Sequence, residues 1–193
     1  MKKEKKDKKE EIKEEKIKKD PQDKVRDFFK ELVPYIIIIF VVICIRTFIT
    51  TPVRVNGTSM DPTFKEGEIL LLNKMDKKYN RFDVVVADAA DTTIIKRVVG
   101  LPGEKIAYKQ CKLYINDEEI KDYVSGCITD DFDLDTIYGY MIIPKDHYFL
   151  MGDNRKDSLD SRDYRVGLVD KSQIKGKIYF RLTPFKRFGS IKK

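Results

Sequence analysis

The sequence has little of the residue types from which metal centres and histidine-based active sites are built. Among its 193 residues it has one histidine, His147, and three cysteines, Cys44, Cys111 and Cys127. It contains no Cys-x-x-Cys pair and no Cys/His cluster, so we expect no zinc site, no other metal and no cofactor. His147 follows Pro144-Lys-Asp, a predicted turn leading into a strand, which is a poor position for a catalytic base.

The chain also lacks a concentrated block of charge of one sign. Its formal net charge is +7, yet residues 1–31 hold 13 Lys and Arg against 10 Asp and Glu, and residues 52–193 hold 25 against 22. A nucleic-acid-binding protein normally clusters its basic residues on one element, with few acids between them. Because the two signs are interleaved here, we expect no nucleic-acid partner.

One long apolar stretch stands near the start of the chain. Leu32 to Ile45 contains no charged residue, Arg46 interrupts the stretch, and uncharged residues continue to Thr51. Twenty helical residues span about 30 Å, enough for a bilayer core, and the long Arg46 side chain can reach the interface. The alternatives are a cleaved signal peptide and a buried strand. The stretch begins too late and lacks an Ala-x-Ala site for the first, and is too long for the second.

These features predict three segments. Residues 1–31 form a charged cytoplasmic tail, and residues 32–51 form a single transmembrane helix in the cell membrane, in contact with the lipid bilayer. Residues 52–193 form an extracytoplasmic domain. The basic residues of the tail set this orientation through the positive-inside rule.

The pattern after residue 52 is typical of β-structure. Short runs rich in β-branched residues are separated by Gly, Pro, Asn and Asp, and no amphipathic helix of any length is evident. We therefore predict a mainly β, antiparallel domain, with residues 122–140 as a polar surface excursion. Cys111 and Cys127 could form a disulfide that contributes about 3 kcal/mol in the chain-entropy model, or could remain free thiols. The sequence leaves both possibilities open.

A serine in a tight turn is the first candidate for chemistry. Ser59 stands in Val55-Asn-Gly-Thr-Ser-Met-Asp-Pro-Thr-Phe64, where Gly57 and Pro62 favour a non-repetitive backbone. A serine held in this way can present its hydroxyl and its backbone N–H to the same point, as acyl transfer requires. The alternative is a loop serine without chemistry.

Lys96 is the candidate base. It lies in the apolar run Ile94-Ile-Lys-Arg-Val-Val99, and strand alternation places Lys96 and Arg97 on opposite faces, so that one of them must point to whichever side is buried. A buried lysine can lose about 3 units of pKa, which makes a neutral amine available near pH 7. An outward-facing lysine on an edge strand is the alternative.

A polar loop after an apolar strand is the third candidate. Gly152-Asp-Asn-Arg-Lys-Asp-Ser-Leu-Asp-Ser-Arg162 offers Asp153, Arg155, Asp160 and Arg162 for ion pairing and Ser158 as a hydroxyl. Such a loop either is solvated or supports a site rigidly.

Together these stretches resemble the type I signal peptidases, the bacterial membrane-bound Ser/Lys endopeptidases. The resemblance rests on Gly-Thr-Ser59-Met-Asp-Pro-Thr, Arg81-Phe-Asp-Val-Val-Val, Ile-Ile-Lys96-Arg-Val-Val-Gly-Leu-Pro-Gly and the 152–162 loop, in this order after the apolar stretch. It covers roughly residues 30–185. It implies a signal-peptidase/repressor-protease-like catalytic domain in its compact, Gram-positive form, with a small second β lobe at about residues 104–143.

The resemblance also implies roles for single residues. Ser59 is the nucleophile, Lys96 the general base, and Ser158 orients the lysine. Asp160 with Arg162, and Asp153 with Arg155, are implied as ion pairs that support the site. The substrate is a preprotein cut after an Ala-x-Ala type site, and the residues implied to bind it are Val53, Val55, Gly57 and Met60.

One position departs from part of the family. Some members carry a serine two residues before the nucleophile as a second oxyanion donor, and this chain has Gly57 there. The second donor is therefore left open. Two other functions also stay open from the residues themselves: a self-cleaving repressor-type Ser/Lys protease, and a membrane-anchored β domain that only binds a partner.

Overall fold

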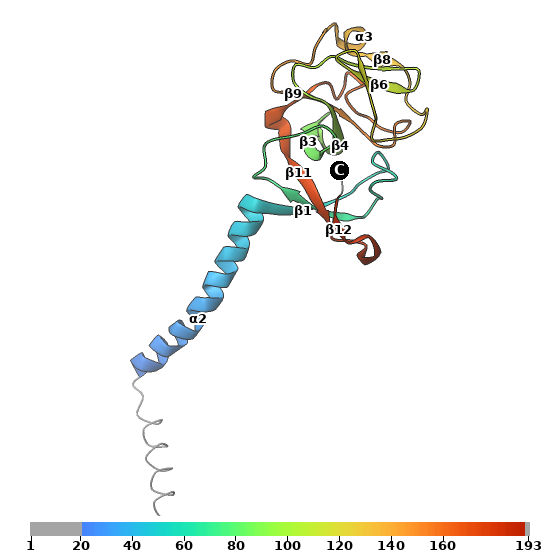
Figure 1. The fold of residues 1–193 in the computed structure, drawn as a ribbon. Coiled ribbons are helices and arrows are strands. Elements are labelled where there is room, and N and C mark those ends of the chain that lie inside the picture. Colours follow the sequence, from blue (N-terminus) through green and yellow to red (C-terminus); the bar gives the residue numbers. More distant parts are fainter. Residues whose placement is uncertain (1–20, 192–193) are drawn as a thin grey trace, which may run out of the picture. The chain divides into compact units, whose positions relative to one another are not determined.

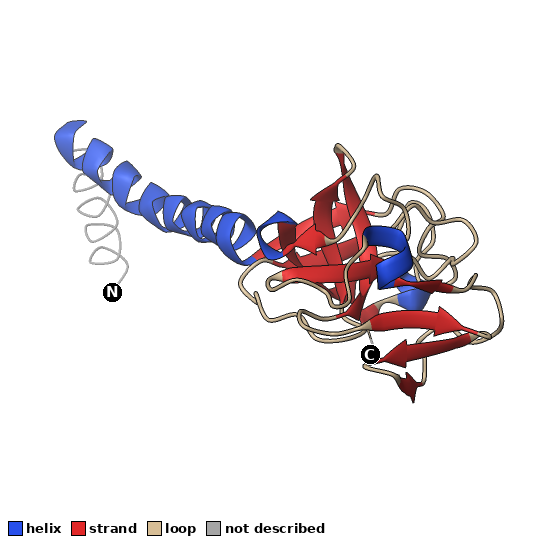
Figure 2. Cartoon of the chain, turned by 90° about the horizontal axis from the view of Figure 1, so that it is seen from above, coloured by secondary structure: helices blue, strands red, loops and turns tan. Residues whose placement is uncertain are grey.

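The computed structural model describes residues 21–191 of the chain (Figure 1). An N-terminal helix, α2 (Pro21–Cys44), continues into a π-helical turn, η1 (Ile45–Ile49). The remaining elements are almost all strands, shown in red in Figure 2. This confirms the predicted mainly antiparallel β domain. The predicted charged tail over residues 1–31 lies mostly outside the described residues.

The predicted transmembrane helix over residues 32–51 is not found. By length and hydropathy, none of the helices between residues 21 and 191 could cross a membrane. The ends of the observed helix also differ from the expected ends at residues 32 and 51. α2 already includes charged residues such as Lys30 and Glu31, and Thr50 and Thr51 belong to a strand rather than to a helix.

The larger sheet has eight antiparallel strands. Seven of them follow the order β1-β2-β11-β3-β4-β9-β10, and β12 pairs with the end of β11. The strands are β1 (Thr50–Arg54), β2 (Ile69–Asn73), β3 (Val84–Ala89), β4 (Thr92–Gly100), β9 (His147–Met151), β10 (Val169–Asp170), β11 (Ile174–Arg181) and β12 (Gly189–Ser190). Short 3-10 turns, η2 (Lys171–Gln173) and η3 (Phe185–Arg187), flank β11.

A second, smaller sheet is formed by one stretch of chain inserted between β4 and β9. Its order is β7-β6-β5-β8, and a one-turn helix, α3 (Leu134–Tyr138), follows it. The strands are β5 (Ile106–Lys109), β6 (Lys112–Ile115), β7 (Glu118–Ile120) and β8 (Phe132–Asp133). Asn116 and Asp117 form the β6–β7 turn with positive φ angles of 52° and 67°, as a tight hairpin turn requires.

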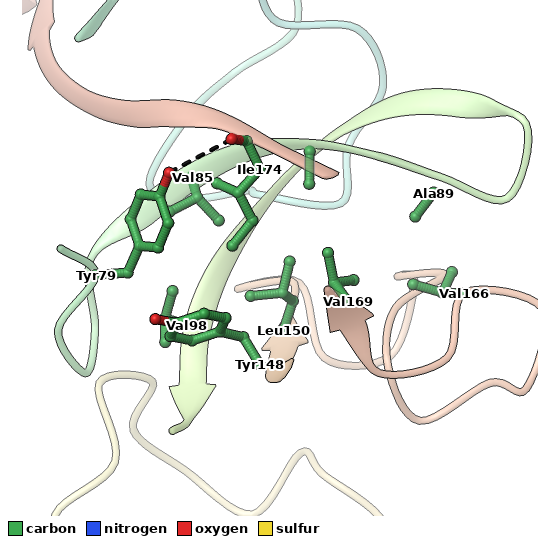
Figure 3. Packing of buried hydrophobic residues seen from close by; sticks show 10 residues of the cluster. Tyr79, Val85, Ala89, Val98, Tyr148, Leu150, Val166, Val169 and Ile174 are labelled. Carbon is green, nitrogen blue, oxygen red and sulfur yellow. Dashed lines mark hydrogen bonds between the residues drawn. The ribbon is translucent and has the colours of Figure 1, made fainter. Parts of the chain in front are cut away.

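The core consists of three buried apolar clusters. In the first, Tyr79 and Tyr148 meet edge to face, and the Tyr79 hydroxyl donates to the Ile174 carbonyl at 3.4 Å (Figure 3). The second cluster joins β4 and β9 to the small sheet. The third contains Met60 and Phe64 from the Ser59 loop. The small sheet and the Ser59 loop are therefore both packed into the same β domain.

The end of β11 and the residues after it contact the Ser59 loop. Arg181 donates to the Thr63 carbonyl at 2.6 Å, and Arg187 donates to the same carbonyl at 2.8 Å. Glu68, which is buried, pairs with Arg187 at 2.7 Å and with Arg181 at 3.1 Å. The charge of the two arginines is thus partly balanced while they hold the loop backbone.

Candidate active site

Ser59 lies on a loop that is closed at its base and anchored by its own side chains. The Val55 N–H donates to the Glu68 carbonyl at 2.8 Å, and the Gly67 N–H donates back to the Val55 carbonyl at 2.9 Å. Met60 and Phe64 are buried in the third core cluster. The polar turn between these anchors therefore holds Ser59, which is half-buried, in one place.

The 152–162 loop docks directly on the Ser59 loop. The backbone N–H of Asn154 donates to the Ser59 carbonyl at 3.0 Å, and its side-chain amide donates to the Thr58 carbonyl at 3.2 Å. The Thr58 hydroxyl donates to the Asp157 carboxylate at 2.8 Å. Two stretches that the sequence analysis singled out separately are thus brought together by hydrogen bonds.

Lys96 projects from β4 and is only 3% exposed. Burial, followed by the positive charge of Arg162, lowers the pKa of Lys96 to about 8, although Asp160, Asp153 and Asp157 act in the opposite direction. A substantial fraction of neutral amine is therefore present at neutral pH. The structure buries the neighbouring Arg97 as well, because both faces of β4 are covered.

Ser59 and Lys96 line the same cavity, which has a volume of about 670 Å³. Its walls are residues 52–60, which include the end of β1 and the turn that holds Ser59, and residues 92–96 of β4, together with Asp157 and Leu159. The predicted substrate-binding residues all lie on these walls: Val53, Val55, Gly57 and Met60. The predicted supporting residues of the 152–162 loop stand behind the cavity instead.

The pair Asp160–Arg162 forms as predicted. Arg162 donates to both oxygens of the Asp160 carboxylate at 2.8 Å, and the Gly152 N–H donates to the same group at 2.9 Å. Burial alone would raise the pKa of Asp160, but the Arg162 guanidinium and the Gly152 N–H lower it overall. Asp160 therefore stays ionised and holds the loop behind Lys96.

The predicted pairing of Asp153 with Arg155 is wrong. Asp153 pairs instead with Arg97, at 2.8 and 2.6 Å, and accepts the Thr63 hydroxyl at 2.5 Å. Arg155 pairs with Asp122 of the inserted segment, at 2.5 and 2.9 Å. The reason is strand register: β4 and β9 pair Arg97 with Met151, which places Arg97 close to Asp153.

Ser158 is half-buried, and its buried hydroxyl oxygen has no hydrogen-bond partner within residues 21–191. It lies near the Asp160 carboxylate and contributes to the lowered pKa of that group. Its predicted contact with Lys96 is therefore not formed in this conformation.

Sequence reasoning missed several residues of the site. Asp157 and Leu159 were part of a recognised loop, but nothing in the sequence indicated that they reach the cavity. Asp122 and Tyr123 lie in the stretch expected to be a surface excursion, yet the Tyr123 ring stacks 3.4 Å from the Arg97 guanidinium. Residues 122–140 are therefore not only a surface feature.

Two further predictions concern metals and thiols. Across residues 21–191, no group of three or more His, Cys, Asp or Glu side chains could hold a metal ion. His147 does not line the cavity; its Nδ1 lies 2.9 Å from the Lys145 carbonyl. Cys111 and Cys127 form a disulfide, which decides between the two possibilities that the sequence left open.

Comparison with known proteins identifies the family. The family described as signal peptidase, peptidase S26, matches residues 26–183. Signal peptidase I of Bacillus caldolyticus is 37% identical over 168 residues, which cover 80% of this chain and 91% of the relative. Signal peptidase IB of Staphylococcus aureus is 38% identical over 180 residues, which cover 82% and 93%. A solved signal peptidase I from Enterococcus faecalis aligns with 32% identity over 52% of this chain and 96% of that chain, at a TM-score of 0.47. On the family match and the sequence identities with its relatives, this chain belongs to the signal peptidase family, peptidase S26.

Proposed function

We propose that this signal peptidase removes N-terminal signal peptides from secreted preproteins with Ser59 as nucleophile and Lys96 as general base. The observation that carries the proposal is that both residues line one cavity and that burial brings the pKa of Lys96 to about 8. At pH 7 a lysine with this pKa is neutral in about one molecule in ten, far more often than an exposed lysine.

The chemistry follows from these two groups. Lys96 Nζ takes the hydroxyl proton while Ser59 Oγ attacks the carbonyl carbon before the cleaved bond. The new amino terminus leaves with the proton that Lys96 returns, and the acyl group stays on Ser59. A water molecule then attacks the ester, again with Lys96 as base, and releases the signal peptide. The Ser59 N–H serves as an oxyanion donor, and Gly57 adds no hydroxyl.

The walls of the cavity support binding of an extended substrate. β1 pairs only with β2, and β4 pairs with β9 only from Arg97 onward. Within residues 21–191, no strand therefore pairs with the second edge of residues 52–54 in β1, or with the edge of residues 92–96 in β4 that faces away from β3, and a peptide could add there as a strand. We propose that small residues before the cut, as in an Ala-x-Ala site, fit against Val53, Val55 and Met60.

We also propose that the enzyme acts at the extracytoplasmic face of the cell membrane. The apolar side chains of α2 between Leu32 and Ile43 are mostly exposed, as expected for a lipid-facing surface. The Cys111–Cys127 disulfide is consistent with an oxidising compartment. Alkaline extraction of membranes, with protease added to intact cells, tests the attachment and the side.

Two active-site variants test the proposal. Purified Ser59→Ala and Lys96→Ala proteins should each lose cleavage of a preprotein, with unchanged circular dichroism. Ser190→Ala and Lys145→Ala change exposed residues of the same types and should cleave like the wild type. Full activity of either active-site variant would refute the assignment. A protein that only binds a partner would be affected by none of the four changes.

A further inference from the structure

We propose that Asp122, in the segment inserted between β4 and β9, is a positioning residue for the nucleophile. It acts through Arg155 on Gly152 and from there on Ser59. The inference rests on the proposed function, because it assigns Asp122 a part in the same cleavage reaction. Asp122 lies outside the three stretches from which the active site was predicted.

The first link is the ion pair between Asp122 and Arg155. The Arg155 side chain is fully buried and that of Asp122 is 8% exposed. Both guanidinium nitrogens of the fork donate to the carboxylate, at 2.5 and 2.9 Å. Among residues 21–191, Asp122 is the only carboxylate within ion-pair distance of Arg155. A buried guanidinium without this partner would be drawn toward water.

The second link joins Arg155 to the backbone of Gly152. Arg155 Nε donates to the Gly152 carbonyl at 3.0 Å. The remaining contact of the guanidinium is a 3.4 Å bond to the Thr129 hydroxyl, which also belongs to the inserted segment. The position of the arginine is therefore set mainly by the inserted segment, and the arginine in turn holds the Gly152 carbonyl while Asp160 holds the Gly152 N–H.

The third link is the contact between Gly152 and Ser59. A Cβ atom built on Gly152 would lie 2.4 Å from the Ser59 carbonyl oxygen and 2.1 Å from the Ser158 Oγ. The Gly152 backbone is thus packed directly against the nucleophile and against the serine predicted to orient Lys96. A shift of Gly152 toward either serine would displace that serine, and misplacement by about 1 Å can cost about 100-fold in rate.

The inserted segment is itself held in place just after Asp122. The Tyr123 ring stacks on Arg97, the residue beside Lys96, at 3.4 Å. Cys127 is tied to Cys111 by the disulfide. The carboxylate therefore reaches Arg155 from a fixed support rather than from a free loop.

The test compares Asp122→Asn with Asp117→Asn in the full chain in detergent. Asp117 pairs with Lys105 in the same segment but is exposed and has no link to the site, so it is the matched control. For Asp122→Asn we expect kcat to fall about tenfold, KM to change less than about twofold, and exchange of the Asn154 amide, which donates to Ser59, to accelerate about tenfold. Asp117→Asn should change none of these values. Wild-type kcat and exchange in Asp122→Asn would overturn the inference.

Arg155→Met provides a second variant, and its combination with Asp122→Asn leaves neither charge of the buried pair. It removes the donor to the Gly152 carbonyl with a side chain of similar length. If Asp122 acts through Arg155, the double variant Asp122→Asn/Arg155→Met should be no slower than Arg155→Met alone. Fully additive losses would refute the route through Arg155. If the wild type cleaves no preprotein, the proposed function fails, while the Asn154 exchange rates still decide the positioning.

Discussion

Arg97 donates two hydrogen bonds to the Asp153 carboxylate, at 2.8 and 2.6 Å, and directly follows Lys96 on the same strand. Two buried basic residues, Lys96 and Arg97, are thus neighbours in β4, but their surroundings differ. Arg97 has a buried carboxylate as partner, whereas Lys96 makes no ion pair within 4 Å in the described part of the chain. The Asp153 carboxylate balances the charge of Arg97, whereas burial disfavours the charged form of Lys96.

The pH dependence of cleavage should report this difference. Because the base must be neutral, activity should rise with pH through an apparent pKa of about 8 and then level off. Lys96→Arg should be inactive at every pH, since a guanidinium does not lose its proton in this range. Rates of preprotein cleavage between pH 6 and 10 would check this. A profile without a step, or an active arginine variant, would remove Lys96 as the base.

Lys96 should also lower the stability of the fold. Its pKa is lowered on folding, so the unfolded state binds more protons between about pH 8 and 10.5, and stability should rise with pH over that window. At pH 7, Lys96→Met should therefore raise the free energy of unfolding by about 2 kcal/mol, within the limit of about 3 kcal/mol set by the shift. Urea unfolding at pH 7 and pH 10 would measure it. A destabilised methionine variant would contradict the argument.

The Arg97–Asp153 pair should be costly to break from one side. Asp153→Asn leaves a guanidinium buried without its countercharge, and such changes cost about 3–5 kcal/mol. Urea unfolding should detect this loss, together with reduced cleavage. Asp163→Asn removes an exposed pair with Arg165 and should have little effect. If the two variants were equally stable, the buried pair would contribute no more to the free energy of unfolding than the exposed pair.

The disulfide should contribute to stability in its own segment. Replacing Cys111 and Cys127 by serine removes a cross-link over a sequence separation of 16 residues, and we expect a loss of about 3 kcal/mol. Thermal melting with and without reductant would test this on the wild type. Cys44→Ser changes a free cysteine and should leave the response to reductant intact. If reductant left the melting temperature of the wild type unchanged, this would argue against the disulfide.

Features that depend on neighbouring residues in the chain could be predicted from the sequence, whereas contacts between distant residues could not. Ser59 and Lys96 were identified because their immediate neighbours are unusual: a tight turn in one case and an apolar strand in the other. The partners of Arg97 and Arg155 were not, because they depend on the register of β4 against β9 and on the path of the inserted segment. Asp153 and Arg155 are two residues apart, but strand register gave Asp153 a distant partner and the path of the inserted segment gave Arg155 another.

The ends of the apolar stretch were also beyond local reasoning. Composition alone favours extending a helix from Leu32 to Thr51, since nothing but Arg46 interrupts it. In the structure, Thr50 and Thr51 pair with Asn73 and Leu72. Strand pairing is a long-range interaction, and it overrides the local preference at this boundary.

The arginines that hold the Ser59 loop come from the other end of the domain. The bonds from Arg181 and Arg187 to the Thr63 carbonyl join residues 118 and 124 positions apart. At about 5–20 residues per second, ribosomal synthesis of that interval takes roughly 6–25 seconds. During this time a nascent chain already carries its serine but not the groups that fix the serine loop. The Ser59 loop therefore gains its final hydrogen bonds late in translation, long after Ser59 itself has been made.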